Sequence, residues 1–598
     1  GKLLPRVGVI KDMEKKNSDS ASQSKSTTSW LNAALWQGRN SMGHGSGFSY
    51  AADRMVAELS SEVSGVIDNA IEAIDKLRDA DELYDKIEAI STPDAPLVDP
   101  PMPPTGKLSK VAEQVLGQTG LWGLFVPHVY GGTGCSFREL VQAVARLASI
   151  NPTVAGLLSV HSTIGAVSAV TTFGSEDQQQ YWLPQLAEGH PLSVFAATEP
   201  DAGCDLHRIS SRLERDGRRL LLTGTKMFIT GATYGRLVKL LALFEEKPVI
   251  VLVQLPQSNT PRFTLQSYGL HPLKHAHNNA LNFQQFSIDS SCVLSPGTGP
   301  DGQERDGMSI VWHGLNRGRV ALAAQASGTI RLLLKQAVLY SGKRFTWGQP
   351  IQTRELVLGR LGRMAAAQLV CEALSGWSAS LIDDECSGEY EAILTKIVAS
   401  RCLRQAAVDA LGIHGGRAFL IGHPLGDSFH DHFAAGVYEG ESDLLGLALL
   451  KGITKHHPLA SKRTLLAWIQ WRISRSLQWF PPREDAALLD SELQSLATQA
   501  RRNLVAASIE TDRLLRTHGR KLAEQQLILT DLSDRIQGFI SCLAVIHYAD
   551  RRADIDSVSA AVCWCRSILS GYSGKSRDMN DYRRLAELGR SCLQTYAS

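Results

Sequence analysis

The chain changes its pattern of apolar residues twice. From about residue 50 to 190, apolar side chains recur mainly at the three- and four-residue spacing of helices. Short runs typical of β-strands follow at 220–223, 227–230, 238–243 and 249–253, separated by Gly, Pro and Asn. Long helical patterns return after about residue 306. This order of segments predicts an α+β fold of separate modules, not alternating βαβ units.

These changes divide the 598 residues into five predicted parts. They are a flexible Ser-rich tail at 1–50, an N-terminal helical domain at 51–193, a middle β domain at 194–303, a C-terminal four-helix domain at 304–455 and a helical extension at 456–598. The tail is expected because its low-complexity stretch has too few apolar residues to offset the entropy of ordering.

Composition favours neither a nucleic-acid partner nor a metal site. A formal charge of +2 gives no argument for nucleic acid, and the ten cysteines show no zinc or disulfide spacing, so no metal site is predicted. No apolar run approaches the roughly 20 residues that span a bilayer. We expect a cytoplasmic protein in a bacterium or a protein of the mitochondrial matrix.

Six short motifs occur in order between about residues 105 and 455. Thr198-Glu-Pro-Asp-Ala-Gly-Cys-Asp205 is followed by Lys226-Met-Phe-Ile-Thr-Gly231, and Val437-Tyr-Glu-Gly440 ends the series. The other three are Gly123–Pro127 with Tyr130–Gly134, Leu315–Arg319, and Arg344–Ile351. In sequence, order and spacing the set resembles the acyl-CoA dehydrogenases. The layout with a C-terminal extension is closest to their very-long-chain subgroup.

The resemblance implies that Glu439 is the catalytic base. A hydrogen alpha to a thioester is a weak acid, so its removal needs a positioned carboxylate and a stabilised enolate. The beta hydrogen leaves as hydride, which requires an electron acceptor such as FAD, because no side chain supplies one. Tyr438 and Gly440 flank the base, and Gly440 would let backbone N–H groups approach the thioester oxygen. A glutamate near a helix start is the plainer alternative.

The same resemblance assigns the residues that contact FAD. Thr198 and Thr230 correspond to donors to the isoalloxazine ring, and Phe228 takes the place of the usual Trp packed on it. An ordinary core aromatic is the alternative for Phe228. Arg344 and Thr346 correspond to contacts with the pyrophosphate and adenine of a neighbouring subunit's FAD, and a guanidinium suits a diphosphate.

Several positions depart from the family pattern. Cys204 replaces a Ser and would hold phosphate less well, while Asp409 and Glu355 stand where Gln is common. In the glycine turn, Gly412 is kept and Ile413 replaces a Gly. Glu441 replaces a Thr or Ser on the flavin side. It either raises the pKa of the base or points to solvent, and the second is preferred.

Substrate and partners follow from the resemblance as well. Arg319 corresponds to an Arg beside the substrate, and Asn316 has the form of long-chain members. We expect a long-chain acyl-CoA as substrate, electron-transferring flavoprotein or a similar acceptor, a homodimer and no nucleic acid. Residues 462–480, basic and Trp-rich, suggest a peripheral membrane contact, although packing on the protein itself is the preferred alternative.

Three other functions remain open at this stage. An acyl-CoA oxidase would use the same scaffold with O2 as acceptor. A non-catalytic assembly or scaffold relative would explain the changes at Asp409 and Glu355. A DNA-associated relative would explain a basic extension and would bind DNA in a strongly salt-dependent way.

Overall fold

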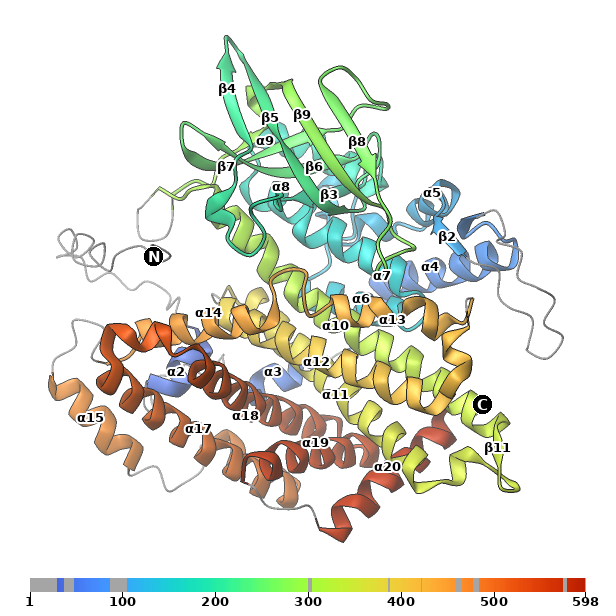
Figure 1. Ribbon diagram of the computed structural model, residues 1–598, viewed down its shortest axis with the longest axis vertical. Helices are drawn as coiled ribbons and strands as arrows, with labels where there is room; N and C mark the ends of the chain where they lie inside the picture. The colour runs from blue at the N-terminus through green and yellow to red at the C-terminus, as the bar shows by residue number, and fades with distance from the viewer. Residues whose placement is uncertain are drawn as a thin grey trace.

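A computed structural model describes residues 29–36, 48–56, 58–86, 105–298, 304–385, 388–420, 422–458, 465–476, 483–573 and 578–596. Helices, a β-sheet and two further groups of helices follow one another, and the sheet lies at the opposite end of the molecule from the last helices (Figure 1). This arrangement confirms the predicted α+β class and the extra helices at the C-terminus.

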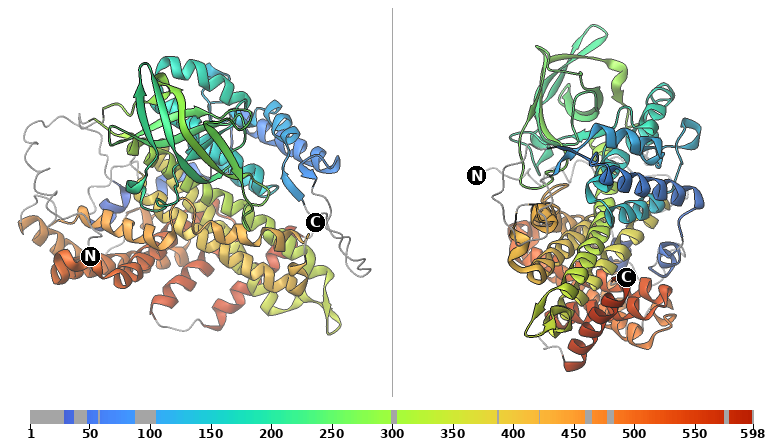
Figure 2. Two further views of the ribbon diagram at one scale, coloured as in Figure 1. Left: turned by 45° about the horizontal axis from the view of Figure 1, so that its top comes forward. Right: turned by 90° about the vertical axis from the view of Figure 1, so that its right-hand side faces the viewer.

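The N-terminal helical part packs beside the sheet (Figure 2). Its helices are α4 (Ser61–Asp79), α5 (Lys110–Gln118), α6 (Phe137–Ala148), α7 (Pro152–Ser159), α8 (Ala166–Phe173) and α9 (Glu176–Glu188), with a π-helical turn η3 (Val160–Ile164) and a small ladder of β1 (Tyr84–Lys86) and β2 (Thr105–Leu108). The sequence encodes the helix starts, because Ser60, Ser109, Ser136 and Ser175 each accept a backbone N–H as N-cap.

The β-sheet is mostly antiparallel, in the order β10-β7-β6-β4-β5-β9-β8, and β3 pairs with β6. Its strands are β3 (Ser193–Ala196), β4 (Arg212–Asp216), β5 (Arg219–Thr230), β6 (Leu237–Phe244), β7 (Lys247–Gln254), β8 (Phe263–Ser267), β9 (Asn278–Asp289) and β10 (Val293–Leu294). The two runs predicted at 220–223 and 227–230 form one strand, β5. An irregularity in its pairing with β9 falls between Lys226 and Ile229 and surrounds Phe228.

Three long helices form the centre of the C-terminal part and two shorter helices follow them. They are α10 (Gly307–Lys343), α11 (Glu355–Asp383), α12 (Glu389–His414), α13 (Pro424–Ala434) and α14 (Ser442–Lys455), with a short hairpin of β11 (Phe345–Thr346) and β12 (Gln349–Pro350) after α10. The loop between β8 and β9 rests on α13, where Lys274 pairs with Asp427 at 3.0 Å. The sheet and the bundle are thereby joined beside the loop that precedes α14.

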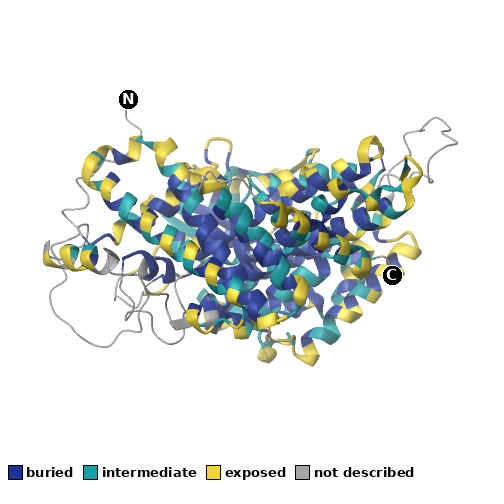
Figure 3. Cartoon of the chain, turned by 90° about the horizontal axis from the view of Figure 1, so that it is seen from below, coloured by how far each residue is buried: buried dark blue, intermediate teal, exposed yellow. Residues whose placement is uncertain are grey.

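The C-terminal extension shares its hydrophobic core with the bundle. It contains α15 (Leu465–Ser476), α16 (Arg483–Ala486), α17 (Ser491–His518), α18 (Gln526–Arg552), α19 (Ile555–Ser573) and α20 (Met579–Tyr596). One cluster of buried side chains runs from α10, α11 and α12 into α17, α18, α19 and α20, and the view from below shows this continuous interior (Figure 3). The parts of the chain before and after the predicted boundary at residue 455 therefore share one hydrophobic core.

The predicted tail at 1–50 differs from the structure in its second half. Helix α2 (Trp30–Trp36) and the start of α3 (Phe48–Met55) lie within it, and Trp30 and Trp36 are buried. Both helices lie among the C-terminal helices, where α2 contacts α12 and α17 and α3 contacts α11 and α18 (Figure 1). Their aromatic side chains provide enough apolar surface to pack against these helices. The Ser-rich composition of the whole segment hid these few aromatic residues, so the segment was predicted to be a tail. Residues 1–28 and 37–47 lie outside the described residues.

The stretch Pro152–Phe173 is long and apolar enough to cross a membrane, judged by length and composition alone. This differs from the expectation that no apolar run approaches the length needed to span a bilayer. About 72% of its most apolar window is buried inside the protein. Burial of this kind is typical of a core helix, and the stretch is interrupted by the π-turn η3.

Helix α15 covers the described part of the segment predicted to contact a membrane. Two of its tryptophans face the protein, since the Trp468 indole donates to Asp512 at 2.8 Å and the Trp471 indole donates to the Leu35 carbonyl at 3.2 Å. Leu466, Ile469 and Ile473 are exposed. Residues 462–464 and 477–480 lie outside the described residues.

Candidate active site

The predicted base lies in a short loop between α13 and α14. Glu439 and Gly440 both have positive φ angles, 58° and 104°. A left-handed conformation is unusual for glutamate and costs free energy, so the surrounding contacts must hold it. Glycine suits the second position, where a Cβ atom would also approach the Leu445 side chain to 2.9 Å.

The Glu439 carboxylate is enclosed where α10 lacks a side chain. A Cβ atom at Gly318 would lie 3.0 Å from Glu439 Oε2 and 2.4 Å from Ile164 Cγ2, so only glycine leaves room for both. Oε2 has no hydrogen-bond partner among the described residues. Burial raises the pKa of Glu439 to about 7, and the charges of Arg319 and Lys396 oppose this rise. A carboxylate with this pKa is suited to accept a proton at neutral pH.

Two buried cations bind the backbone of this loop. Arg319 Nε donates to the Glu439 carbonyl at 3.2 Å, and its Nη1 donates to Asn316 Oδ1 at 3.1 Å. From the opposite side, Lys396 Nζ donates to the Gly440 carbonyl at 2.6 Å. The structure thus brings together the predicted base and the residues assigned to the substrate, which are Asn316, Arg319, Tyr438, Glu439 and Gly440.

Glu441 has a structural partner that the two sequence-based alternatives did not include. Its carboxylate accepts the backbone N–H groups of Asp443 and Leu444 at 2.9–3.1 Å and is the N-cap of α14. Carboxylates at this position stabilise a helix start. Glu441 therefore points to the helix end.

A cavity of about 500 Å³ lies at the end of α10 and α12. It is lined by Tyr340, Arg344, Thr346, Ile351, Ile413, His414, Gly415, Gly416 and Arg417. The Tyr340 and His414 rings are stacked with centroids 4.7 Å apart. Two guanidinium groups, a hydroxyl and a glycine turn are a donor set that fits a diphosphate, and the stacked rings suit a planar base. Three predicted cofactor residues, Arg344, Thr346 and Ile413, line this cavity.

Asp409 and Gly412 lie close to the cavity in sequence but do not line it. The Asp409 carboxylate is buried and accepts from Arg363 at 2.6 and 3.1 Å. The Gly412 carbonyl accepts from Arg360 at 2.7 Å. Asp409 and Gly412 were predicted to contact the cofactor, but here both bind arginines of α11. The reason is that α12 directs the Asp409 side chain toward that helix. Glu355 is the first residue of α11.

The β domain presents the remaining predicted residues. The Met227 N–H donates to the Thr198 carbonyl at 2.9 Å, and the Thr230 hydroxyl donates to Asn278 at 2.7 Å. Phe228 has a positive φ of 56° and is 54% exposed, so it is not a core aromatic. Its exposed ring fits a side chain that packs on a planar ligand.

A buried ion pair joins the two motifs that carry these residues. Lys226 Nζ lies 2.7 Å from Glu199 Oε1, and both side chains are almost fully buried. Glu199 also accepts the backbone N–H groups of Ser210 and Ser211. Cys204, in contrast, is exposed on the loop after Thr198, close enough to Lys396 to affect its ionisation.

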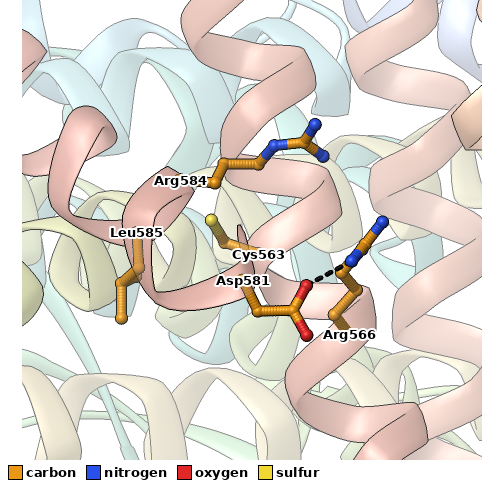
Figure 4. Close-up of a pocket in the computed structure, with 5 residues that line it drawn as sticks. All are labelled: Cys563, Arg566, Asp581, Arg584 and Leu585. Atoms are coloured by element: carbon orange, nitrogen blue, oxygen red, sulfur yellow. Dashed lines mark hydrogen bonds and ion pairs between the residues drawn. The ribbon is translucent and has the colours of Figure 1, made fainter. Parts of the chain in front are cut away.

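A second cavity lies between α19 and α20 and is lined by Cys563, Arg566, Asp581, Arg584 and Leu585 (Figure 4). Its volume is about 10 Å³, roughly the space of one water molecule. Arg566 pairs with Asp581 and Arg584 pairs with Glu492. The cavity is a gap between packed helices of the extension and is too small to hold a substrate.

Sequence reasoning missed Lys396 and the cavity residues Tyr340 and Arg417, whereas His414 lies within the predicted glycine turn. A lysine inside the apolar run 393–400 was a usable signal, because lysine is almost never fully buried unless it is paired. Tyr340 and Arg417 gave no such signal, since their role depends on how the ends of α10 and α12 meet.

Comparison with known proteins agrees with this arrangement. The N-terminal domain profile of the acyl-CoA dehydrogenases matches residues 105–190, and their C-terminal domain profile matches residues 305–454. An acyl-CoA dehydrogenase of Bacillus subtilis (strain 168) is 30% identical over 342 residues, which are 56% of this chain and 87% of that protein. This chain belongs to the acyl-CoA dehydrogenase family.

Two further relatives show how far the likeness extends. The mitochondrial very long-chain specific acyl-CoA dehydrogenase of Bos taurus is 27% identical over 350 residues, 57% of this chain but only 52% of that protein. The crystal structure of an acyl-CoA dehydrogenase complexed with FAD from Bacillus anthracis has a TM-score of 0.71 at 16% identity, and covers 91% of this chain and 98% of that chain. At this identity the likeness shows the fold, and its coverage extends into the C-terminal helices.

Proposed function

We propose that this chain oxidises an acyl-CoA thioester to the trans-2-enoyl-CoA, with Glu439 as the base that removes the alpha proton. The observation that carries the proposal is the enclosed Glu439 carboxylate opposite Gly318. One of its oxygens has no hydrogen-bond partner in the part of the chain that the structure describes, and burial raises its pKa to about 7. A base enclosed in this way accepts a proton without competition from water.

FAD is the proposed cofactor, and two sets of residues fit it. Arg344, Thr346 and Arg417 at the cavity would hold the diphosphate, while Thr198, Phe228 and Thr230 of the β domain would contact the flavin ring. When bound, FAD supplies the acceptor for the hydride from the beta carbon. The chain's own task is to orient the thioester and hold the base.

A homodimer is proposed from the surface around the cavity. Phe345, Trp347, Leu356 and Phe419 are between 58% and 91% exposed, next to the residues that line the cavity. Large apolar groups gathered around a polar cavity are typical of a surface that a partner covers. A second copy of the chain would shield them and close the cofactor site.

The finer aspects of the function rest on similarity. The likeness to the bovine very long-chain specific enzyme supports a long-chain acyl-CoA as substrate. Electron-transferring flavoprotein or a similar carrier is the proposed acceptor, and the bacterial cytoplasm or the mitochondrial matrix is the proposed location. A peripheral membrane contact would use the exposed face of α15.

The test is an absorption spectrum of the purified protein before and after anaerobic addition of palmitoyl-CoA. We expect flavin bands that bleach with substrate, and loss of bleaching in Glu439→Gln. The control Glu82→Gln, which changes an exposed carboxylate on another part of the chain, should bleach like the wild type. A protein that cannot take up FAD, or a Glu439→Gln variant that bleaches at the wild-type rate, would refute the proposal.

The same sample separates the dehydrogenase from the oxidase. After bleaching, admission of air should restore the bands only slowly if an external carrier is the natural acceptor. Because O2 takes the two electrons of the reduced flavin and becomes peroxide, peroxide should form at the same slow rate. Rapid steady peroxide production without an added acceptor would instead establish the oxidase alternative.

A further inference from the structure

The loop that carries Glu439 is bound to α12 by a group of contacts centred on one lysine. Lys396 is 0% exposed in the middle of α12, and its Nζ donates to the Gly440 carbonyl at 2.6 Å. The Ser442 hydroxyl lies 3.4 Å from Nζ and donates to the Gly436 carbonyl at 3.0 Å. Lys396 therefore contacts the loop at the peptide next to the base and at the start of α14.

This lysine complements Arg319 across the loop. Arg319, from α10, binds the carbonyl of Glu439, and Lys396, from α12, binds the carbonyl of Gly440. These carbonyls belong to the two residues with positive φ. Charged donors form stronger hydrogen bonds than neutral ones, so two cations from two helices hold a backbone conformation that costs free energy when left alone.

We propose that Lys396 is a positioning residue for the base: its ammonium group fixes the Gly440–Glu441 peptide, one residue after the base, and its charge keeps the enclosed Glu439 carboxylate ionised near neutral pH. The inference rests on the proposed role of Glu439. It adds to that role a second ionisable group, which lies on helix α12.

The charges around the base determine the expected pH dependence. Arg319 and Lys396 both face Glu439 and lower its pKa, against the larger effect of burial. Tyr438 adjoins the base and itself faces Asp431, while Glu389 faces Arg319, and Glu441 and Cys204 face Lys396. Loss of the lysine charge must raise the proton affinity of Glu439, so a higher pH is needed to ionise it.

Lys396 has its own ionisation on the alkaline side. Burial lowers its pKa to about 8, although the charge of Glu439 opposes this shift. The wild-type rate should therefore rise as Glu439 ionises near pH 7 and fall when Lys396 loses its proton at higher pH. An arginine at this position stays charged, so it should keep the first transition and remove the second.

The first experiment measures the rate of flavin reduction by palmitoyl-CoA in single turnovers from pH 5.5 to 9.5. In Lys396→Met the acid midpoint should rise by about one to two pH units, as expected when one charge is removed close to a buried carboxylate. Lys396→Arg should keep the wild-type acid midpoint and lose the alkaline decline. Thr395→Val is the matched control, because Thr395 is buried on the same helix but contacts Ser378 at 2.7 Å instead of the loop.

The second experiment needs no turnover and separates this inference from the proposed function. The unfolding midpoint of the holoenzyme is measured at pH 5 and pH 8 for the wild type, Glu439→Gln, Lys396→Met and the double variant. The stabilisation by Glu439→Gln at pH 8 should be larger when Lys396 is Met, because the carboxylate then lacks its counter-charge. A wild type that does not bleach refutes the proposed function, yet this coupling remains measurable.

Two results would overturn the inference. One is an acid midpoint in Lys396→Met equal to that of the wild type, and the other is additive unfolding effects in the double variant. If Lys396→Met does not fold, Lys396→Arg still decides, since an unchanged alkaline decline in that variant excludes Lys396 as its source.

Discussion

The backbone and the side chain of Glu439 are both held in states that cost free energy. Its φ of 58° lies in the left-handed region, and one oxygen of its enclosed carboxylate has no hydrogen-bond partner among the residues that the structure describes. Such features persist only where the surrounding structure imposes them, and they concentrate at active sites. In this molecule Gly318, Arg319 and Lys396 impose them from two helices.

The free-energy cost of burying the Glu439 carboxylate predicts that the folded protein becomes more stable when the charge is removed. Burial raises the pKa of Glu439 from 4.5 to about 7, so between these values the folded protein binds more protons than the unfolded chain and stability falls as pH rises. Glu439→Gln should therefore stabilise the protein by up to about 3 kcal/mol at pH 8. The measurement is the unfolding midpoint against pH, and the gain should disappear near pH 4.5. A variant less stable than the wild type at pH 8 would contradict it.

Lys239 on β6 is a second buried charge, and it has no hydrogen-bond partner among the described residues. Its side chain is 0% exposed and lies 4.6 Å from the centre of the Phe195 ring. Burial lowers its pKa to about 7, so the folded protein binds fewer protons than the unfolded chain between pH 7 and 10.5 and gains stability as pH rises.

Replacement of this lysine should stabilise the fold. Lys239→Met keeps the length of the side chain and removes the charge, so we expect a gain of up to about 4 kcal/mol at pH 7 that decreases toward pH 10. Thermal unfolding at pH 7 and at pH 10 measures this gain in stability. Lys335→Met, on α10, is a matched control that should change stability little at either pH.

At the scale of single elements, the motifs named residues that the structure places side by side, while the pattern of apolar residues did not predict every strand. Glu439, Arg319 and Asn316 come together because short motifs mark loop and helix positions where few residue types fit. Strands β3, β4, β8 and β10 were not predicted, since each is short. The burial of Lys396 and the position of α2 depend on contacts distant in sequence, 44 residues away for the lysine and 436 for the Leu35 carbonyl of α2.

Helix α15 gives a testable case of an element with two apolar faces. Trp468 and Trp471 bind the protein, whereas Leu466, Ile469 and Ile473 are spaced along one exposed stripe. An amphipathic helix with such a stripe inserts into the membrane interface. We expect the wild type to sediment with anionic phospholipid vesicles, and the triple variant L466S/I469S/I473S to lose this while keeping activity. Equal sedimentation of both would contradict a contact through α15.

At the scale of the whole molecule, the extension completes the bundle. Residues of α17, α18, α19 and α20 share one buried cluster with α10, α11 and α12. A chain shortened to residues 1–455 would expose the faces of α11 and α12 that these helices cover. We expect it to be insoluble, or soluble only with strong binding of a hydrophobic dye. A monomeric, cooperatively unfolding product with bound flavin would show that the extension is a separate domain.

The position of α2 also has a consequence for biosynthesis. Ser29 and Leu31 bind Glu391, the Trp36 indole binds the Ile453 carbonyl, and the Phe48 ring is stacked on His547. The ribosome therefore makes the N-terminal aromatic residues hundreds of codons before their partners emerge. At the usual speed of translation this interval is roughly 25 to 100 s. During that time the segment is an exposed apolar sequence on a nascent chain, which is the kind of sequence that a holdase chaperone recognises.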